Sequence, residues 1–320
     1  MERIIFIGYG YMAKNINNAI SKTTKKEVYY IDKFHNEGDR WYASIEDFLK
    51  TNKNINDFIF FICSPSNTHF EYLESLIKIG AKYIFVEKPA FLKPSEHDIL
   101  KPLIERFKPK IFVGYILRFS GIFEIFKKNI RLLKENGFSL SLVNVYYQKK
   151  KLDDPRNKFD IGVYEEYFHI ADLLLNVIIQ DDSIQDISIK KSRVISKRLI
   201  YLESELRTTD GCHIDIVSSF ISQNKKRDFI IKFIKGQESA EIHLYFDKDG
   251  DDIIRLFYNE SLDHEYISPA NIKLDIEISK ALEYFFDENF NSEIHHFDDS
   301  RKIAKLTDTI ERLVTNENAI

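Results

Sequence analysis

A glycine-rich turn near the N-terminus has the residue types and spacing of a phosphate-binding loop. Gly8, Gly10 and Ala13 follow the pattern GxGxxA, directly after the apolar run RIIFI. The glycines allow a tight turn and let a pyrophosphate approach the amides of a helix N-terminus, while the small Ala13 allows close helix packing. Asp32 ends the next apolar run, about 20 residues later, where a carboxylate accepts the ribose hydroxyls of NAD. We therefore predict a dinucleotide site that favours NAD, because Asp32 would repel a 2′-phosphate; Lys33 beside it leaves NADP open.

A second group of polar residues stands at the end of a strand-like run, in the stretch YIFVEKPAF. Glu87, Lys88 and Pro89 follow four mostly apolar residues. Parallel sheets bind ligands at the carboxyl ends of their strands, so functional side chains are expected there. A lysine screened from water can gain the basicity that a proton relay needs. An ion pair between Lys88 and a neighbouring carboxylate is the alternative interpretation.

A third group lies in the stretch VYEEYFHIADLLL. On a helix, Glu165, His169 and Asp172 fall at i, i+4 and i+7, on one face, and an apolar run follows them. This spacing predicts a helix whose polar end faces a cleft; a surface helix with a satisfied histidine is the alternative. The preceding loop QKKKLDDPRNKFD carries Lys149 and Arg156 among its cations. They could hold a carboxylate or the diphosphate of a nucleotide sugar, unless the loop is merely a solvated charged segment.

The elements that must position these groups differ between the two parts of the chain. Up to about residue 120, near-continuous apolar runs alternate with helix-like segments, which predicts a parallel sheet covered on both faces, the doubly wound pattern. Beyond it, strand-like runs separated by turn signals predict a largely antiparallel sheet with hairpins, flanked by helices. We expect an α/β protein with two domains, residues 1–120 and 121–320, joined without a linker. Packing of the C-terminal helix against the first domain is left open.

Composition narrows the classes of partner and location. The 320 residues carry a formal net charge of -4, so nucleic acid is not an expected partner. The N-terminal apolar run is too short for a secretory signal, and no run of about 18 apolar residues could span a bilayer, which predicts a cytoplasmic protein. Cys63 and Cys212 lie far apart without a motif and are expected to be reduced thiols. No Cys/His set has zinc spacing and DKDGDD lacks EF-hand spacing, so we predict no metal site and a hairpin turn at DKDGDD.

The block FFICSPSNTHFEYLESLIKIGAKYIFVEKPAF, together with GYGYMA and GYILRF, resembles the glucose-fructose oxidoreductase and inositol dehydrogenase family, Gfo/Idh/MocA. The resemblance covers essentially the whole chain in organisation, with motif support up to about residue 120. It implies an N-terminal Rossmann domain and a C-terminal α+β domain built on a large open sheet. It also implies an NAD(P)-dependent dehydrogenase or reductase that acts on a CH–OH group of a sugar, cyclitol or nucleotide-sugar-type substrate. A homodimer or homotetramer assembled through the C-terminal sheet would follow.

The resemblance implies roles for individual residues as well. Lys88 would reach the nicotinamide ribose and the substrate hydroxyl, and His169 would act as an acid or base beside it. Glu165 or Asp172 would orient or charge these two. With the motif arguments above, the predicted cofactor contacts are Gly8, Gly10, Tyr11, Met12, Asp32, Ser64, Pro65, His69, Glu87, Lys88 and Arg118. The predicted substrate contacts are Lys88, Tyr115, Lys149, Arg156 and His169.

Departures from the family pattern concern the substrate side. Tyr167 stands where glycine is common, Ile116 replaces a frequent polar residue, and Ser120 with Gly121 replaces a proline region. Two alternatives therefore stay open: a redox-neutral enzyme that retains its NAD, and a non-catalytic NAD(H)-binding sensor or scaffold. A biliverdin-reductase-like activity uses a similar architecture, and the intact EKP argues against it.

Overall fold

The computed structural model describes residues 3–23, 25–34, 38–151, 162–179, 183–196, 198–247, 250–287, 290 and 297–317. The chain folds into two compact units. The first comprises residues 1–116 and 274–305, and the second residues 117–273 and 306–320. The sequence analysis expected a boundary between residues 120 and 121, because the type of secondary structure changes there along the chain. The first unit also includes 274–305 because Ile278, Ala281 and Phe285 bury their side chains there.

A six-stranded parallel sheet forms the centre of the first unit, in the order β3-β2-β1-β4-β5-β6. Its strands are β1 (Arg3–Ile7), β2 (Val28–Ile31), β3 (Trp41–Tyr42), β4 (Phe58–Ile62), β5 (Tyr83–Glu87) and β6 (Lys110–Gly114). Every residue of β4 is buried, because neither face of the sheet is open to water. The strand order reverses between β1 and β4, which is where doubly wound sheets bind their ligands.

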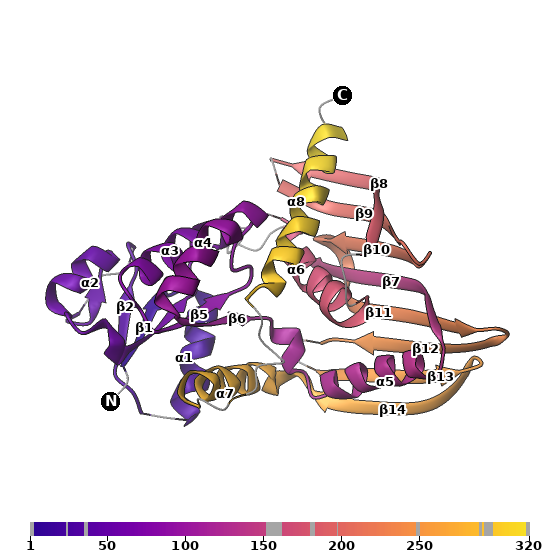
Figure 1. Ribbon diagram of the computed structural model, residues 1–320, viewed down its shortest axis with the longest axis horizontal. Helices are drawn as coiled ribbons and strands as arrows, with labels where there is room; N and C mark the ends of the chain where they lie inside the picture. The colour runs from indigo at the N-terminus through magenta and orange to yellow at the C-terminus, as the bar shows by residue number, and fades with distance from the viewer. Residues whose placement is uncertain are drawn as a thin grey trace. The chain divides into compact units, whose positions relative to one another are not determined.

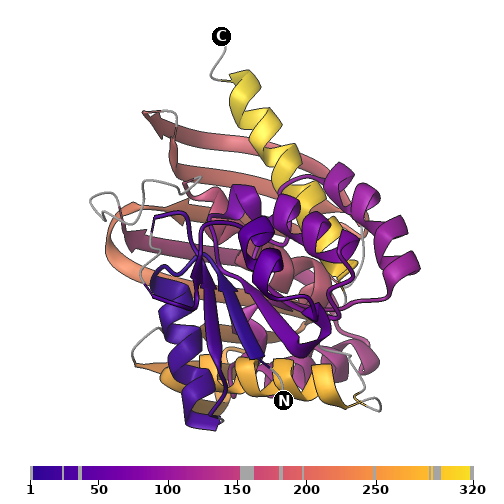
Figure 2. The same cartoon turned by 90° about the vertical axis from the view of Figure 1, so that its left-hand side faces the viewer.

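Helices cover both faces of this sheet, with α3 and α4 on one and α1 and α7 on the other (Figures 1 and 2). The helices are α1 (Tyr11–Thr23), α2 (Ile45–Thr51), α3 (His69–Lys78), α4 (Pro94–Phe107) and α7 (Lys273–Phe286). Lys110 Nζ donates to the carbonyls of Tyr284 and Phe285 at the end of α7, at 3.0 and 3.2 Å. Lys22 of α1 pairs with Asp275 of α7 at 2.7 Å. A segment from the end of the chain thus completes one face of the N-terminal sheet.

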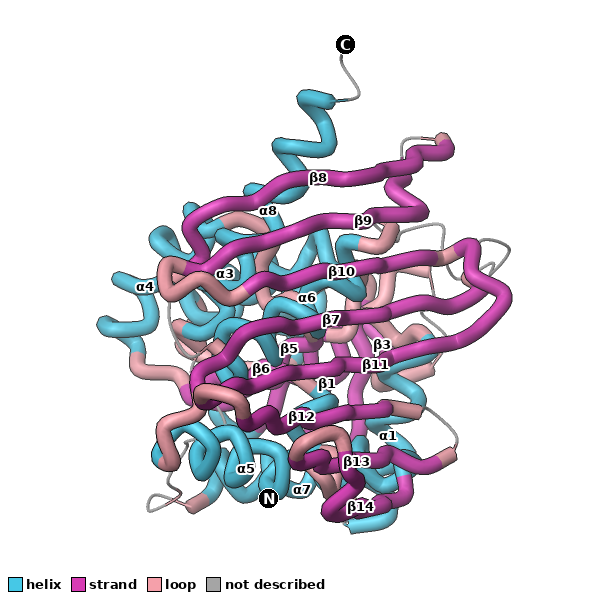
Figure 3. The backbone as a smooth tube through the Cα atoms, turned by 90° about the vertical axis from the view of Figure 1, so that its right-hand side faces the viewer, coloured by secondary structure: helices cyan, strands magenta, loops and turns pink. Residues whose placement is uncertain are grey.

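An eight-stranded sheet forms the second unit, in the order β14-β13-β12-β11-β7-β10-β9-β8 (Figure 3). Its strands are β7 (Ser139–Lys150), β8 (Ile184–Ile195), β9 (Arg198–Thr208), β10 (His213–Ser219), β11 (Ile221–Lys235), β12 (Glu238–Tyr245), β13 (Asp251–Tyr258) and β14 (Ser261–Pro269). Among the strands that the structure describes in this sheet, only β7 and β10 pair in parallel, so the predicted mostly antiparallel sheet is confirmed. β8 and β9, which follow each other in the chain, pair antiparallel.

Helices α5 (Phe123–Glu135) and α6 (Tyr164–Leu173) lie on one face of this sheet, which Figure 3 shows from the other side. Every residue of α6 except Glu165 is buried, as expected for a core helix. A π-helical turn over Leu174–Ile178 continues α6. Short 3₁₀ turns cover Ile55–Asp57, Ser66–Thr68, Ile116–Phe119 and Ala270–Ile272, and α8 spans Asp299–Glu317. Both cysteines are free thiols, and no helix in the described ranges is long and apolar enough to cross a bilayer.

Candidate functional site

The glycine-rich turn has the shape that a dinucleotide pyrophosphate requires. Gly8 has a φ of +81°, and a Cβ at this position would lie 2.7 Å from Ser64 Cα, so only glycine lets β1 pass this close to the chain after β4. At Gly10 no atom lies within 4 Å of the place that a Cβ would occupy. Helix α1 begins at the next residue, Tyr11, and Met12 follows in its first turn. The space in front of the first amides of α1 therefore fits a phosphate group.

Asp32 is fixed beside this turn by two backbone amides. The N–H of Tyr9 donates to Oδ2 and the N–H of Phe34 donates to Oδ1, each at 2.9 Å. Carboxylate oxygens can accept more than one hydrogen bond, so Asp32 can still accept from ribose hydroxyls. Tyr30 stacks on Trp41 at 4.2 Å and meets Tyr9 edge-on at 4.4 Å between ring centroids. The sequence analysis missed this aromatic cluster, although all three residues stand close to the predicted motif.

Two loops at the carboxyl edge of the sheet are joined through His69. Its Nδ1 lies 2.7 Å from the carbonyl of Pro89, and its Nε2 lies 2.8 Å from the carbonyl of Ser64. Burial lowers the pKa of His69 and favours the neutral ring, which can donate to only one of these carbonyls. Both nitrogens face backbone oxygens, so His69 positions the segment of Ser64 and Pro65 against the segment of Lys88.

The EKP segment follows directly on β5. Glu87 is the last residue of the strand, is 8% exposed, and accepts a hydrogen bond from the backbone N–H of Lys88. Burial raises the pKa of Glu87 to about 7, against the opposing effect of the Lys88 ammonium. The Lys88–Pro89 peptide bond is cis, which the sequence could not decide. Tyr115, predicted at the substrate, is buried in the same unit and donates from its hydroxyl to Ser300 Oγ at 3.0 Å.

In the second unit, Arg118 and Asp172 form a buried ion pair. Arg118 Nε lies 3.0 Å from both oxygens of Asp172, and Nη2 donates to Oδ1 as well. Asn176 also donates to Oδ1 at 3.0 Å. The side chains of the pair are 5% and 2% exposed. The structure thus joins two residues that were predicted for separate tasks, Arg118 at the cofactor and Asp172 in catalysis.

His169 lies on α6 within a cluster of buried charged and aromatic side chains. Its ring stacks on Tyr147 of β7, with centroids 6.0 Å apart and planes at 15°. Glu166, one helical turn before it, is 5% exposed and pairs with Lys149. Burial lowers the pKa of Lys149 to about 8, although the nearby Glu166 opposes the shift. The predicted Glu165 instead approaches Lys151 at 3.7 Å.

The sequence analysis missed Glu166 because it counted the polar stripe from Glu165. A pairing at i and i+3 from Glu166 to His169 was the available signal. Gly162 sets the entry to α6: its φ is +86°, and a Cβ there would lie 2.2 Å from the carbonyl oxygen of Leu199. The N–H of Val163 donates to that carbonyl at 2.8 Å. The helix is therefore anchored to β9 just before its first charged residue.

An excess of positive charge surrounds Phe220 at this end of the unit. Lys151, Lys149 and Arg198 approach its ring at 4.8, 5.3 and 6.0 Å from the centroid. Arg227 lies over the Tyr147 ring at 5.4 Å, and its buried Nε has no hydrogen-bond partner among the residues that the structure describes. Glu166 pairs with Lys149, Glu165 approaches Lys151, and Asp247 and Asp252 lie near Arg227. The predicted Arg156 lies outside the described residues.

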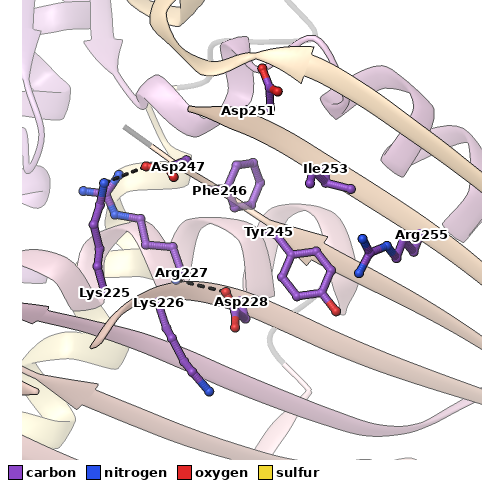
Figure 4. Close-up of a pocket in the computed structure, with 10 residues that line it drawn as sticks. All are labelled: Lys225, Lys226, Arg227, Asp228, Tyr245, Phe246, Asp247, Asp251, Ile253 and Arg255. Atoms are coloured by element: carbon purple, nitrogen blue, oxygen red, sulfur yellow. Dashed lines mark hydrogen bonds and ion pairs between the residues drawn. The ribbon is translucent and has the colours of Figure 1, made fainter. Parts of the chain in front are cut away.

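Arg227 also lines a hollow of about 320 Å³ at the ends of β11, β12 and β13 (Figure 4). Figure 4 shows Lys225 reaching Asp247, at 2.7 Å, on one side and Arg255 facing Tyr245 on another. The lining carries both signs of charge, with Asp228 and Asp251 among the acids. Arg227 is therefore the side chain that connects this hollow to the Tyr147 and His169 stack.

One group among the described residues has the donors for a metal ion. Glu205, His213 and Asp215 lie together on the face of the sheet opposite α6. Lys190 Nζ stands 2.9 Å from the carboxylates of both Glu205 and Asp215. The ammonium already supplies the positive charge that a metal would bring.

The strand order of the first unit, its glycine turn and the carboxylate after β2 define a Rossmann-type dinucleotide-binding unit. Residues 2–115 match a family model described as "Oxidoreductase family, NAD-binding Rossmann fold". This is the family that the motifs of these residues predicted, Gfo/Idh/MocA, and the predicted cofactor NAD is confirmed. A comparison with curated proteins found no match.

Solved structures of similar fold cover nearly the whole chain. UDP-N-acetylglucosamine 3-dehydrogenase GnnA from Acidithiobacillus ferrooxidans has a TM-score of 0.73 at 15% identity, with 97% of each chain covered. The WlbA dehydrogenase from Bordetella pertussis, in complex with NADH and UDP-GlcNAcA, has 0.73 at 14% identity over 99% of this chain and 97% of that one. Biliverdin reductase from Synechocystis, with biliverdin and NADP+, has 0.74 at 11% identity over 97% and 98%. At these identities the likeness establishes the fold and leaves the substrate undecided.

Proposed function

We propose that this oxidoreductase transfers a hydride between a nicotinamide cofactor and a secondary alcohol or ketone of a sugar, cyclitol or nucleotide-sugar-type substrate. The observation that carries the proposal is Lys88, at the carboxyl end of β5 in the unit that holds the glycine turn. The strand ends of such a sheet are where ligands bind. Two of the similar structures, GnnA and WlbA, are named as dehydrogenases, the first of a UDP-sugar.

Several residues of the first unit would hold the cofactor. The amides that open α1, after Gly8 and Gly10, would bind its pyrophosphate, with Tyr11 and Met12 in the first turn. Asp32 would accept from the ribose, and Ser64 and Pro65 would border the dinucleotide after β4. When bound, the nicotinamide supplies or accepts the hydride.

Lys88 and His169 are the residues that we assign to the proton. In the oxidation direction, Lys88 Nζ in its neutral amine form, or an unprotonated ring nitrogen of His169, takes the hydroxyl proton as the carbon loses its hydride. In the reduction direction the same atom returns that proton to the oxygen. Glu166, which was not among the predicted residues, is close enough to the His169 cluster to set its charge. The buried Arg118 and Asp172 pair would keep α6 in position for this task.

The positive charge around Phe220 favours an anionic substrate, such as a sugar acid or a nucleotide sugar. Lys149, Lys151, Arg198 and Arg227 gather in this part of the unit, and Glu165, Glu166, Asp247 and Asp252 are counter-charges near them among the described residues. Carboxylates and phosphates bind best where several charged donors converge. Assembly through the eight-stranded sheet and a cytoplasmic location remain predictions of the sequence.

The proposal is tested by measuring NADH binding from its fluorescence and then NAD reduction with a panel of UDP-sugars, sugar acids and free polyols. We expect turnover with an anionic sugar, and a loss of roughly 100-fold or more in kcat for Lys88→Ala, the usual size of an acid–base contribution. Lys93→Ala, which removes an exposed lysine five residues away, is the matched control.

Each alternative makes a different prediction in the same experiment. If NAD copurifies with the protein and does not exchange, a redox-neutral enzyme is favoured over a dehydrogenase. Tight NADH binding without turnover would favour a sensor or scaffold; Tyr167, buried and bonded to Ser204 at 2.8 Å where the family often has glycine, is the feature that motivates this alternative. Turnover that is unaffected by Lys88→Ala would refute the assigned role of the lysine.

A further inference from the structure

Three positions at the carboxyl edge of the first sheet lie side by side. The register pairs Ile62 with Val86 and Glu87 with Gly114, so Cys63, which follows Ile62, stands beside Glu87. Side chains at paired positions of neighbouring strands point to the same face of a sheet. Glu277 of α7 comes from that side: its Oε1 lies 3.5 Å from the place where a side chain on Gly114 would begin. Glycine at 114 thus leaves room for a carboxyl group from a helix far along the chain, next to Glu87.

The two carboxyl groups are withdrawn from water. Glu277 is 1% exposed and Glu87 is 8% exposed. Glu277 Oε1 is buried and has no hydrogen-bond partner among the described residues. Two neighbouring buried carboxylates repel each other and lose their hydration, so they cannot both be ionised at modest cost. This site therefore favours holding a proton at neutral pH.

The surroundings decide which oxygen holds that proton. Burial, and then the charge of Glu87, raise the pKa of Glu277 well above its ordinary value, and no cation among the described residues opposes the shift. Glu87 has the Lys88 ammonium and a backbone N–H to stabilise its anion, and its pKa rises only to about 7. Burial, Glu87 and Glu277 also raise the pKa of Cys63, which keeps the thiol neutral. Burial also lowers the pKa of His69, which joins two loops at this edge, and favours its neutral ring.

We propose that Glu87 and Glu277 act as one proton-sharing pair, and that Glu277 is a positioning residue for the segment that carries Lys88. At neutral pH the proton is on a carboxyl oxygen of Glu277, and Glu87 can then carry the single negative charge beside Lys88. If Glu277 lost its proton at alkaline pH, two buried carboxylates would repel each other beside the segment that carries Lys88. The argument for proton sharing uses only residues of the first unit and does not depend on the reaction. The effect of the pair on turnover rests on the proposed function.

The pH dependence of unfolding tests the shared proton without any substrate. A carboxyl group whose pKa is raised by folding binds more protons in the folded state than in the unfolded state. Stability from this group is present below its unfolded pKa and falls as the pH rises toward its folded pKa. Glu277→Gln lacks this contribution. Above about pH 5, the unfolding equilibrium constant of the variant should therefore rise less steeply with pH than that of the wild type. The difference should be up to tenfold per pH unit, or about 1.4 kcal/mol. Glu283→Gln, on the same helix but 45% exposed, should match the wild type. Equal slopes for wild type and Glu277→Gln would overturn the proposal.

Infrared spectroscopy gives a second measurement that does not depend on the stability of one variant. At about pH 8, above the pKa of about 7 of Glu87, the wild type should show the carbonyl band of a buried protonated carboxyl group. The band should disappear in Glu277→Gln and persist in Glu87→Gln, because Glu277 stays buried there. Loss of the band in Glu87→Gln alone would place the proton on Glu87 and overturn the assignment.

The pH profile of turnover tests the positioning role. Activity of the wild type should fall at alkaline pH as Glu277 ionises, and this limb should move to higher pH in Glu277→Gln, with NADH affinity unchanged. If the pH profile of turnover is the same in Glu277→Gln and the wild type while the unfolding slopes differ as expected, Glu277 has no positioning role, but the shared proton is still supported. If no sugar is turned over, the proposed function fails, while the unfolding and infrared results still decide the pair.

Discussion

The buried pair of Arg118 and Asp172 gives the sharpest prediction about stability. Asp172→Asn keeps the size of the side chain but removes its charge, so the buried guanidinium of Arg118 loses the carboxylate that its Nε and Nη2 contact. The side chains are 5% and 2% exposed, so water cannot compensate. Removing one partner of such a pair costs about 3–5 kcal/mol, and we expect about 3 kcal/mol because the asparagine oxygen still accepts a hydrogen bond.

Urea unfolding followed by far-ultraviolet circular dichroism measures this loss. Asp308→Asn is a matched control, because Asp308 pairs with the exposed Arg312 on α8, where a surface pair contributes roughly 0.5 kcal/mol. The double variant with Arg118→Met and Asp172→Leu should recover most of the stability, since apolar side chains of similar size can replace a buried ion pair. The reasoning is wrong if Asp172→Asn loses less than about 1 kcal/mol. If Asp172→Asn loses turnover but keeps its stability, Asp172 has the catalytic role that the sequence suggested.

Three further predictions concern the cofactor and the substrate. Gly8→Ala should destabilise the protein by about 1–3 kcal/mol, because the added Cβ would meet Ser64 and the φ of this residue is left-handed. Gly10→Ala should leave urea unfolding unchanged and weaken NADH binding at least about 10-fold, because its Cβ meets no protein atom but would enter the phosphate site. Asp32→Asn should weaken NADH binding about 10-fold or more, the size of one charge-assisted hydrogen bond, and should strengthen NADPH binding in the same fluorescence titration. Lys149 has a pKa lowered from 10.5 to about 8, so the folded state binds fewer protons than the unfolded state between these values. Stability relative to Lys149→Met should therefore rise across this window by up to about 1.4 kcal/mol per pH unit, and the KM for an anionic sugar should rise above pH 8.

Matched variants separate these effects from general damage. Asp39→Asn and Lys150→Met change exposed neighbours of the same charge and should behave as wild type. Unaltered NADH binding in Gly10→Ala would contradict the phosphate site at α1. Unchanged preference between NADH and NADPH in Asp32→Asn would contradict the ribose contact. A KM that is independent of pH would remove Lys149 from the substrate site.

The sequence by itself determined the dinucleotide-binding unit, because its signals are local. The GxGxxA turn, the carboxylate about 20 residues later and the near-continuous apolar runs all report structure within one strand, turn and helix. Burial on both faces of β4 leaves no room for polar residues, so the pattern predicts that strand directly. By contrast, β14 is exposed along almost its whole length, so its burial pattern carries no alternation that a sequence could show.

Only the tertiary structure decided which side chains meet. Glu277 reaches Gly114 and the neighbourhood of Glu87 because α7 returns to the first sheet, a contact between segments about 160 residues apart that no periodic pattern encodes. Arg227 reaches Tyr147 because β11 pairs with β7 in one register. Asp172 lies on the predicted helix, yet its partner Arg118 comes from a turn far earlier in the chain. Local sequence sets which face of an element is apolar, whereas the partner of a buried charge depends on register and packing between elements, and these are properties of the folded chain alone.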